Sequence, residues 1–123
     1  MTAASLLVNG KIFSQTDLDP DSDPDLHPAV TEFFQQLPAA QREPFMGYCA
    51  ESALISDQLW GLDQERASGG WTTLDEAVEH FAGSALVSRK IRPAGDPEHG
   101  RPAEPCHSCA ALMERLGIES VGE

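Results

Sequence analysis

The stretch Pro105-Cys106-His107-Ser108-Cys109 opens an apolar helical run near the end of the chain. Two cysteines three residues apart at the start of a helix can turn both sulfurs toward one point beyond the helix end. The free N–H groups and the positive dipole at that end favour thiolates, and the proline sets the approach of the chain without losing a needed N–H. Taken alone, the pattern fits a redox pair, a structural metal site or half of a catalytic metal site.

A second motif lies far upstream, where Cys49 and Glu51 are separated by one residue. A hydrolytic zinc site uses three protein ligands and keeps one position for water, and thiolates bind Zn²⁺ well. With Cys49, Cys106 and Cys109 as ligands, Glu51 is placed to take a proton from the water and hand it to a leaving group. The combination therefore predicts an open zinc site.

Three other arrangements of the same residues remain open. A redox Cys-x-x-Cys would use the downstream pair alone and would leave Cys49 and Glu51 unexplained. A closed structural zinc site would need a fourth ligand, which His107 or His99 would supply. Cys49 would act as a nucleophile only with a histidine base, and the four histidines form no recognisable arrangement.

Length and composition predict one compact domain over residues 1–123. No stretch approaches the roughly 20 apolar residues that cross a bilayer, so we expect no membrane association. The N-terminal segment from Met1 to Val8 has no signal-peptide pattern. We therefore expect a reducing, cytoplasmic location, where an odd count of 3 cysteines favours catalysis or metal binding over disulfides.

The net charge is −12, from 8 basic and 20 acidic residues. Because phosphate contacts need basic side chains, this balance argues against a long footprint on duplex DNA or RNA. A negative surface instead suits a basic protein partner. It motivates a second hypothesis, a non-catalytic interaction module in which zinc has only a structural role.

Turn and capping signals predict an α/β arrangement with a mixed sheet. Asn9-Gly10 between two apolar runs indicates a hairpin, and Thr73 with Glu76 forms a capping box that starts a helix. The acidic, proline-containing segment 17–27 is a solvated connector, because Ser22 occupies the glycine position of a calcium loop. The expected helices are 28–37, about 44–62, 73–83 and 106–116, and Gly61 with the pair Gly69-Gly70 marks the exit loop of the second. The expected strands are 6–8, 11–13, 85–92 and 118–121, and residues 93–105 form a loop.

The two motifs in this order resemble the zinc-dependent cytidine deaminase superfamily, whose signature is H-x-E followed by P-C-x-x-C. Cys49 replaces the histidine, as in three-cysteine members. The segments Gly47-Tyr48-Cys49-Ala50-Glu51 and Pro-Cys-His-Ser-Cys-Ala-Ala-Leu-Met-Glu-Arg-Leu-Gly-Ile look most like the YwqJ-related deaminases, a bacterial branch linked by gene context to polymorphic toxin systems. The resemblance spans roughly residues 45–121.

The resemblance implies a cytidine-deaminase-like three-layer fold, with helices packed on the faces of a mixed sheet. It implies Zn²⁺ on Cys49, Cys106 and Cys109, and Glu51 as proton shuttle. The implied reaction is hydrolytic deamination of a cytosine-type base in a nucleoside, a nucleotide or a single-stranded nucleic acid. By analogy it also allows a homo-oligomer and secretion by a toxin-delivery route.

The chain departs from the three-cysteine free-nucleoside deaminases at Ser52, where those enzymes often carry an arginine beside the glutamate. Three thiolates and Zn²⁺ sum to −1, which weakens the metal as a Lewis acid. We therefore expect compensation from the helix dipoles or from Arg42, Arg89 or Arg101.

Five residues are candidates for contact with the substrate. Phe45, Tyr48 and Trp71 are aromatic side chains on which a base could stack, although aromatics at helix starts are more often part of the core. His99 lies in the loop that leads into the second motif, and Pro105 directly precedes its first cysteine.

Overall fold

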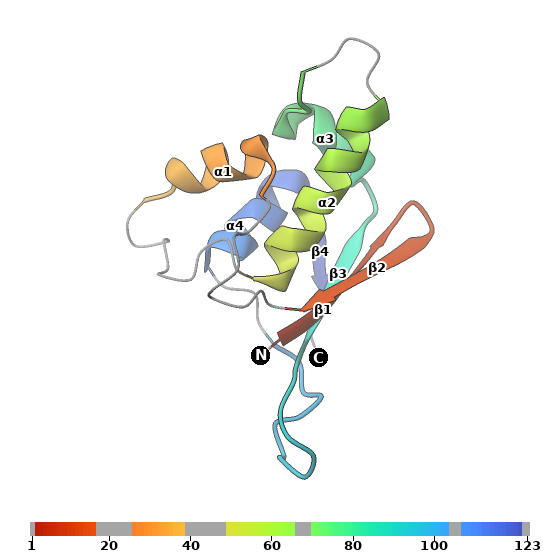
Figure 1. The fold of residues 1–123 in the computed structure, drawn as a ribbon, viewed down its shortest axis with the longest axis vertical. Helices are drawn as coiled ribbons and strands as arrows, with labels where there is room; N and C mark the ends of the chain where they lie inside the picture. Colours follow the sequence, from red (N-terminus) through yellow and green to blue (C-terminus); the bar gives the residue numbers. More distant parts are fainter. Residues whose placement is uncertain (1, 17–25, 39–48, 66–69, 104–106, 122–123) are drawn as a thin grey trace.

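The computed structural model describes residues 2–16, 26–38, 49–65, 70–103 and 107–121. Within these ranges the chain forms a four-stranded sheet and four helices (Figure 1), which confirms the α/β class. The elements in chain order are β1 (Thr2–Val8), β2 (Lys11–Thr16), α1 (Pro28–Gln35), α2 (Ala50–Glu65), α3 (Leu74–His80), β3 (Ala85–Lys90), α4 (His107–Leu116) and β4 (Glu119–Val121).

The sheet is mixed, as predicted, with strand order β2-β1-β3-β4. β1 pairs antiparallel with β2 and β3, whereas β3 pairs parallel with β4. The predicted hairpin turn is confirmed: Asn9 and Gly10 have φ angles of 52° and 79°, the left-handed conformations that a tight two-residue turn requires. The parallel pair needs a crossover connection, and α4 lies within it.

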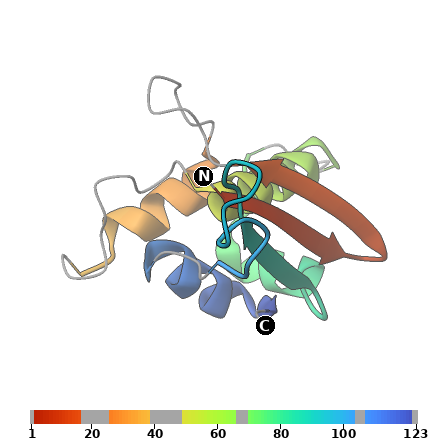
Figure 2. The same cartoon turned by 90° about the horizontal axis from the view of Figure 1, so that it is seen from below.

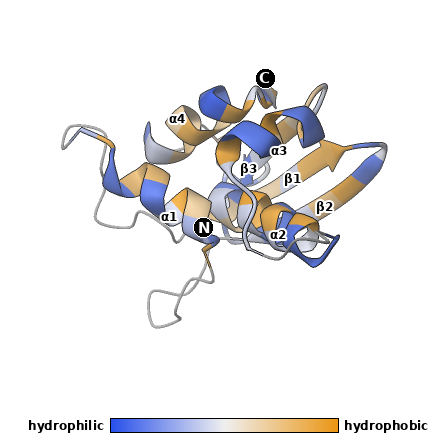
Figure 3. Cartoon of the chain, turned by 90° about the horizontal axis from the view of Figure 1, so that it is seen from above, coloured by the Kyte–Doolittle hydropathy of each residue, from blue (hydrophilic) through white to orange (hydrophobic). Residues whose placement is uncertain are grey.

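One face of the sheet forms the floor of the core. Side chains alternate along a strand, so Ala4, Leu6 and Val8 of β1 are all buried on the same face, and Leu86 of β3 joins them. α2 packs against β1 and β2. The described helices gather on this side (Figure 3).

The opposite face of the sheet is largely open. Leu7, Ile12 and Val121 lie on it and are 45%, 72% and 42% exposed. The helices of the described ranges therefore cover mainly one face of the sheet.

The position of His27 corrects the prediction for the connector. Residues 17–25 lie outside the described ranges, but His27 is fully buried. Its Nδ1 accepts a hydrogen bond from the Ala29 amide at 3.1 Å, so it caps α1, which begins at Pro28 as predicted. Its Nε2 lies 2.7 Å from Oδ2 of Asp63. A buried imidazole bonded at both nitrogens is part of the core.

The prediction that Gly61 marks the exit from the helix expected over about 44–62 is wrong, because α2 continues to Glu65. A glycine inside a helix costs about 1 kcal/mol relative to alanine. Leu59 is fully buried just before Gly61, and Asp63 just after it bonds to His27 and to the Thr72 amide. These contacts outweigh the local penalty.

Other local predictions are confirmed. Thr73 Oγ1 accepts from the Glu76 amide at 3.2 Å, and the Glu76 carboxylate accepts from the Thr73 amide at 3.3 Å, which completes the capping box of α3. Gly117, with φ 74°, follows α4. None of the described helices combines the length and apolar character needed to cross a membrane.

Candidate metal and proton-transfer site

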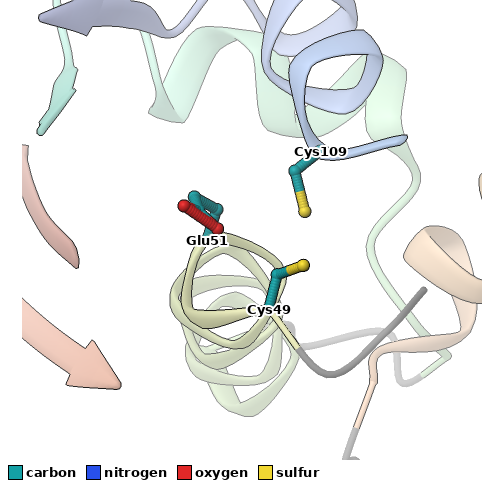
Figure 4. Close-up of side chains that lie close together, drawn as sticks. All are labelled: Cys49, Glu51 and Cys109. Atoms are coloured by element: carbon teal, nitrogen blue, oxygen red, sulfur yellow. The ribbon is translucent and has the colours of Figure 1, made fainter. Parts of the chain in front are cut away.

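The first turns of α2 and α4 bring the two motifs together. Cys49 directly precedes α2, and its carbonyl accepts a bond from the Ala53 amide at 3.2 Å. Glu51 is the second residue of α2, and Cys109 is the third residue of α4. The two sulfurs point into the same space with the Glu51 side chain beside them (Figure 4). The ligand atoms of the three residues all lie within 4.8 Å of one another.

This group is shielded from solvent. Cys49, Glu51 and Cys109 are 9%, 3% and 0% exposed, and neither of these cysteines forms a disulfide. Two helix N-termini meet here, and their partial positive charges favour nearby thiolates and a carboxylate. Thiolates or a carboxylate at this position would be costly to bury without such compensation.

Cys49 and Cys109 fit two ligand positions of a zinc site. Sulfur donors about 2.3 Å from a tetrahedral zinc lie roughly 3.8 Å apart, so donor atoms within 4.8 Å need only small side-chain adjustments to share one ion. Cys49 and Cys109 would supply two of the thiolates that zinc accepts, and the Glu51 carboxylate lies beside them. Cys106, the third predicted ligand, and Pro105 lie outside the described residues.

Comparison with known proteins supports this interpretation. The family model of the YwqJ-like deaminases matches residues 2–118. The chain belongs to the YwqJ-like deaminase family. This family is part of the cytidine deaminase-like superfamily, so the resemblance inferred from the two motifs is confirmed. Neither the curated proteins nor the solved structures yield a significant match.

One residue at the site of this YwqJ-like deaminase belongs to neither of the two sequence motifs. The hydroxyl of Ser88 on β3 donates to Oε1 of Glu51 at 2.9 Å, and both residues are 3% exposed. The sequence indicates that Ser88 faces the core, because side chains alternate along a strand and Ser88 shares a face with Leu86. A small polar residue at a core-facing strand position needs a partner, but the sequence does not say which one.

The structure also explains Ser52. It is fully buried, and its hydroxyl donates to the Cys49 carbonyl at 2.9 Å. A long charged side chain would not fit this position without rearranging the start of α2. Compensation for the thiolates therefore has to come from elsewhere than the residue after Glu51.

The arginines offer little of that compensation in the described part of the chain. Arg101 pairs with Glu98 at 3.4 Å in an exposed loop, and Arg89 is exposed on β3. Arg42 lies outside the described residues. Among the predicted sources, the helix N-termini are those that the structure places at the group.

Trp71 lies away from the cysteines. It precedes Thr72, whose amide donates to Asp63 at 2.6 Å near the C-terminal end of α2. Asp63 follows Glu51 by twelve residues, which corresponds to about 18 Å of helix. Trp71 is 41% exposed and contacts the His27 ring, with ring centroids 5.8 Å apart. The structure does not bring it to the Glu51 group.

His99 lies in the loop that extends from β3 away from the body of the fold (Figures 1 and 2). Its Nδ1 accepts from the Arg92 amide at 3.0 Å, and its side chain is exposed. Among the described residues, the close donor group contains no histidine. Phe45 and Tyr48, the other candidates for substrate contact, lie outside the described residues.

Proposed function

We propose that this YwqJ-like deaminase removes, by hydrolysis, the exocyclic amino group of a cytosine-type base in a nucleoside, a nucleotide or a single-stranded nucleic acid. The observation that carries the proposal is the buried group of Cys49, Glu51 and Cys109 in a chain of a deaminase family. In this proposal Cys49, Cys106 and Cys109 hold Zn²⁺.

The roles of the residues follow from their chemistry. When bound, zinc supplies the Lewis acidity that makes water a nucleophile at neutral pH. Glu51 takes a proton from the attacking water and delivers it to the base, whose amino group leaves as ammonia while a carbonyl forms. Because Glu51 is 3% exposed, bulk water does not compete for that proton.

The overall charge narrows the substrate class. A net charge of −12 disfavours duplex nucleic acid and favours a small molecule or a short single strand. Thiolate ligands must stay reduced to bind zinc, which supports a reducing compartment. We further propose one domain over residues 1–123, supported by a family match over 2–118 and a continuous core.

The test combines metal content with ammonia release. Purified protein should hold about one zinc per chain and release ammonia from cytidine, cytidine monophosphate or a cytosine-containing oligonucleotide. Glu51→Gln should keep the zinc and lose at least about 100-fold in turnover, the scale of general acid–base catalysis. Glu65→Gln, at the exposed far end of α2, is the matched control and should leave turnover unchanged.

Two results would count against the proposal. Folded, metal-free protein that still deaminates would remove zinc from the reaction. A fourth zinc ligand from the protein instead of water, seen in the zinc-loaded crystal structure, would favour the interaction module with a structural zinc, which the acidic surface also suits.

A further inference from the structure

We propose that Ser88 is the positioning residue of the proton carrier, holding the Glu51 carboxylate in its working orientation. The catalytic consequence rests on the proposed function. The contact itself is a property of the fold that can be tested separately.

The contact joins two buried polar groups from different elements. Ser88 Oγ and Glu51 Oε1 lie 2.9 Å apart, although 37 residues separate them in sequence. Hydrogen bonds to a carboxylate are stronger than those between neutral groups. Since both side chains are 3% exposed, water cannot readily replace a lost partner, and removing the hydroxyl would take one donor away from the Glu51 carboxylate.

The backbone of Ser88 connects the same residue to the chain leading into the second motif. Its carbonyl accepts from the Ala103 amide at 2.9 Å, and the Lys90 amide donates to the Arg101 carbonyl at 2.8 Å. Ala103 precedes Pro105 by two positions. Ser88 therefore contacts the proton carrier through its side chain and the approach to Cys106 through its main chain.

The Ser88 hydroxyl suits the needs of Glu51 as a proton carrier. A glutamate side chain has three rotatable bonds, and proton transfer needs its oxygens within hydrogen-bond reach of both the proton's source and its destination. A bond at one oxygen restricts that freedom. A hydroxyl both donates and accepts, so the contact can persist while Glu51 gains and loses a proton.

The kinetic test uses the zinc-loaded protein and the best cytosine-type substrate. Ser88→Ala keeps the main-chain bonds and removes only the hydroxyl. We expect turnover to fall roughly 10- to 100-fold, the effect of misplacing a catalytic group, with KM within about twofold and zinc content unchanged. Ser88→Thr, which keeps the hydroxyl and suits a strand, should stay within about threefold of the wild type.

A matched control lies just before the same strand. Ser84 is also 3% exposed, and its hydroxyl donates to the Phe81 carbonyl at 2.6 Å, not to Glu51. Ser84→Ala should lower stability and leave turnover unchanged. Turnover of Ser88→Ala within twofold of the wild type, or an equal loss in Ser84→Ala, would overturn the positioning role.

A double-mutant cycle separates this inference from the proposed function. Ser88→Ala, Glu51→Ala and the double variant are compared by chemical unfolding at fixed zinc, which requires no substrate. Residues in direct contact should show a coupling of roughly tenfold in the unfolding equilibrium constant. If the wild type deaminates no substrate and the coupling is still present, the proposed function is wrong and the contact between Ser88 and Glu51 is supported. An absence of coupling would refute the contact even in an active enzyme.

Discussion

The replacement Asp63→Asn tests the buried cluster that holds the far end of α2. Asp63 accepts two hydrogen bonds, from His27 Nε2 through Oδ2 at 2.7 Å and from the Thr72 amide through Oδ1 at 2.6 Å. Because His27 Nδ1 accepts from Ala29, the imidazole proton lies on Nε2 and is donated to Asp63. Both bonds therefore end on oxygens of one carboxylate.

The size of the stability loss depends on how many hydrogen bonds asparagine can accept. Asparagine has one oxygen and one NH₂ group, so it can accept only one of these bonds and turns a donor toward the other. His27 is fully buried and Thr72 is 3% exposed, so the abandoned N–H finds no water. Loss of a bond to a charged acceptor costs about 2–3 kcal/mol. For a domain of this size that is a melting temperature lower by roughly 8–12 °C.

The pH dependence gives a second signature of Asp63. Burial alone would raise its pKa, but the hydrogen bonds from Thr72 and the neighbouring His27 outweigh burial and hold the pKa of Asp63 below its usual value. A depressed carboxyl pKa contributes stability above the unfolded value of about 3.9 and loses it as the pH falls through this region. Asparagine does not titrate, so the gap between the wild type and Asp63→Asn should narrow below about pH 4.

Urea unfolding of both proteins between pH 3 and pH 7 measures these effects. The matched control is Asp57→Asn on the same helix, whose exposed carboxylate accepts one bond from Gln15 at 3.2 Å. It should change the free energy of unfolding by less than about 0.5 kcal/mol. An effect of Asp63→Asn as small as that of the control, or a difference that stays constant with pH, would contradict these roles of Asp63.

Two further predictions concern α3. Burial lowers the pKa of His80, whose Nε2 donates to Gln58 and whose Nδ1 accepts from Asn9. Because the unfolded chain then binds the proton more tightly than the folded one, stability should fall as the pH drops below about 6.5. The unfolding free energy of His80→Gln, measured by chemical denaturation, should lack this pH-dependent loss. Thr73→Ala removes one half of the capping box with Glu76 and should cost about 1 kcal/mol; an unchanged unfolding free energy would contradict it.

Signals that depend on near neighbours predicted much of the fold. The Asn9-Gly10 turn and the Thr73 cap were readable because they are set within four residues. Gly61 misled the prediction because a local helix penalty was outweighed by contacts that the sequence does not display. His27 was missed for the same reason, since its partner Asp63 lies 36 residues away.

The amino-acid sequence alone identifies the reactive groups of this YwqJ-like deaminase. Two short motifs carry the thiols and the carboxylate, and their residue types suffice to indicate the family. Which side chains become neighbours of these groups depends on the tertiary structure. Strand register and helix packing place Ser88 on Glu51 and Cys109 beside Cys49, and such long-range pairings arise from burial of the whole core and leave no pattern in any one segment.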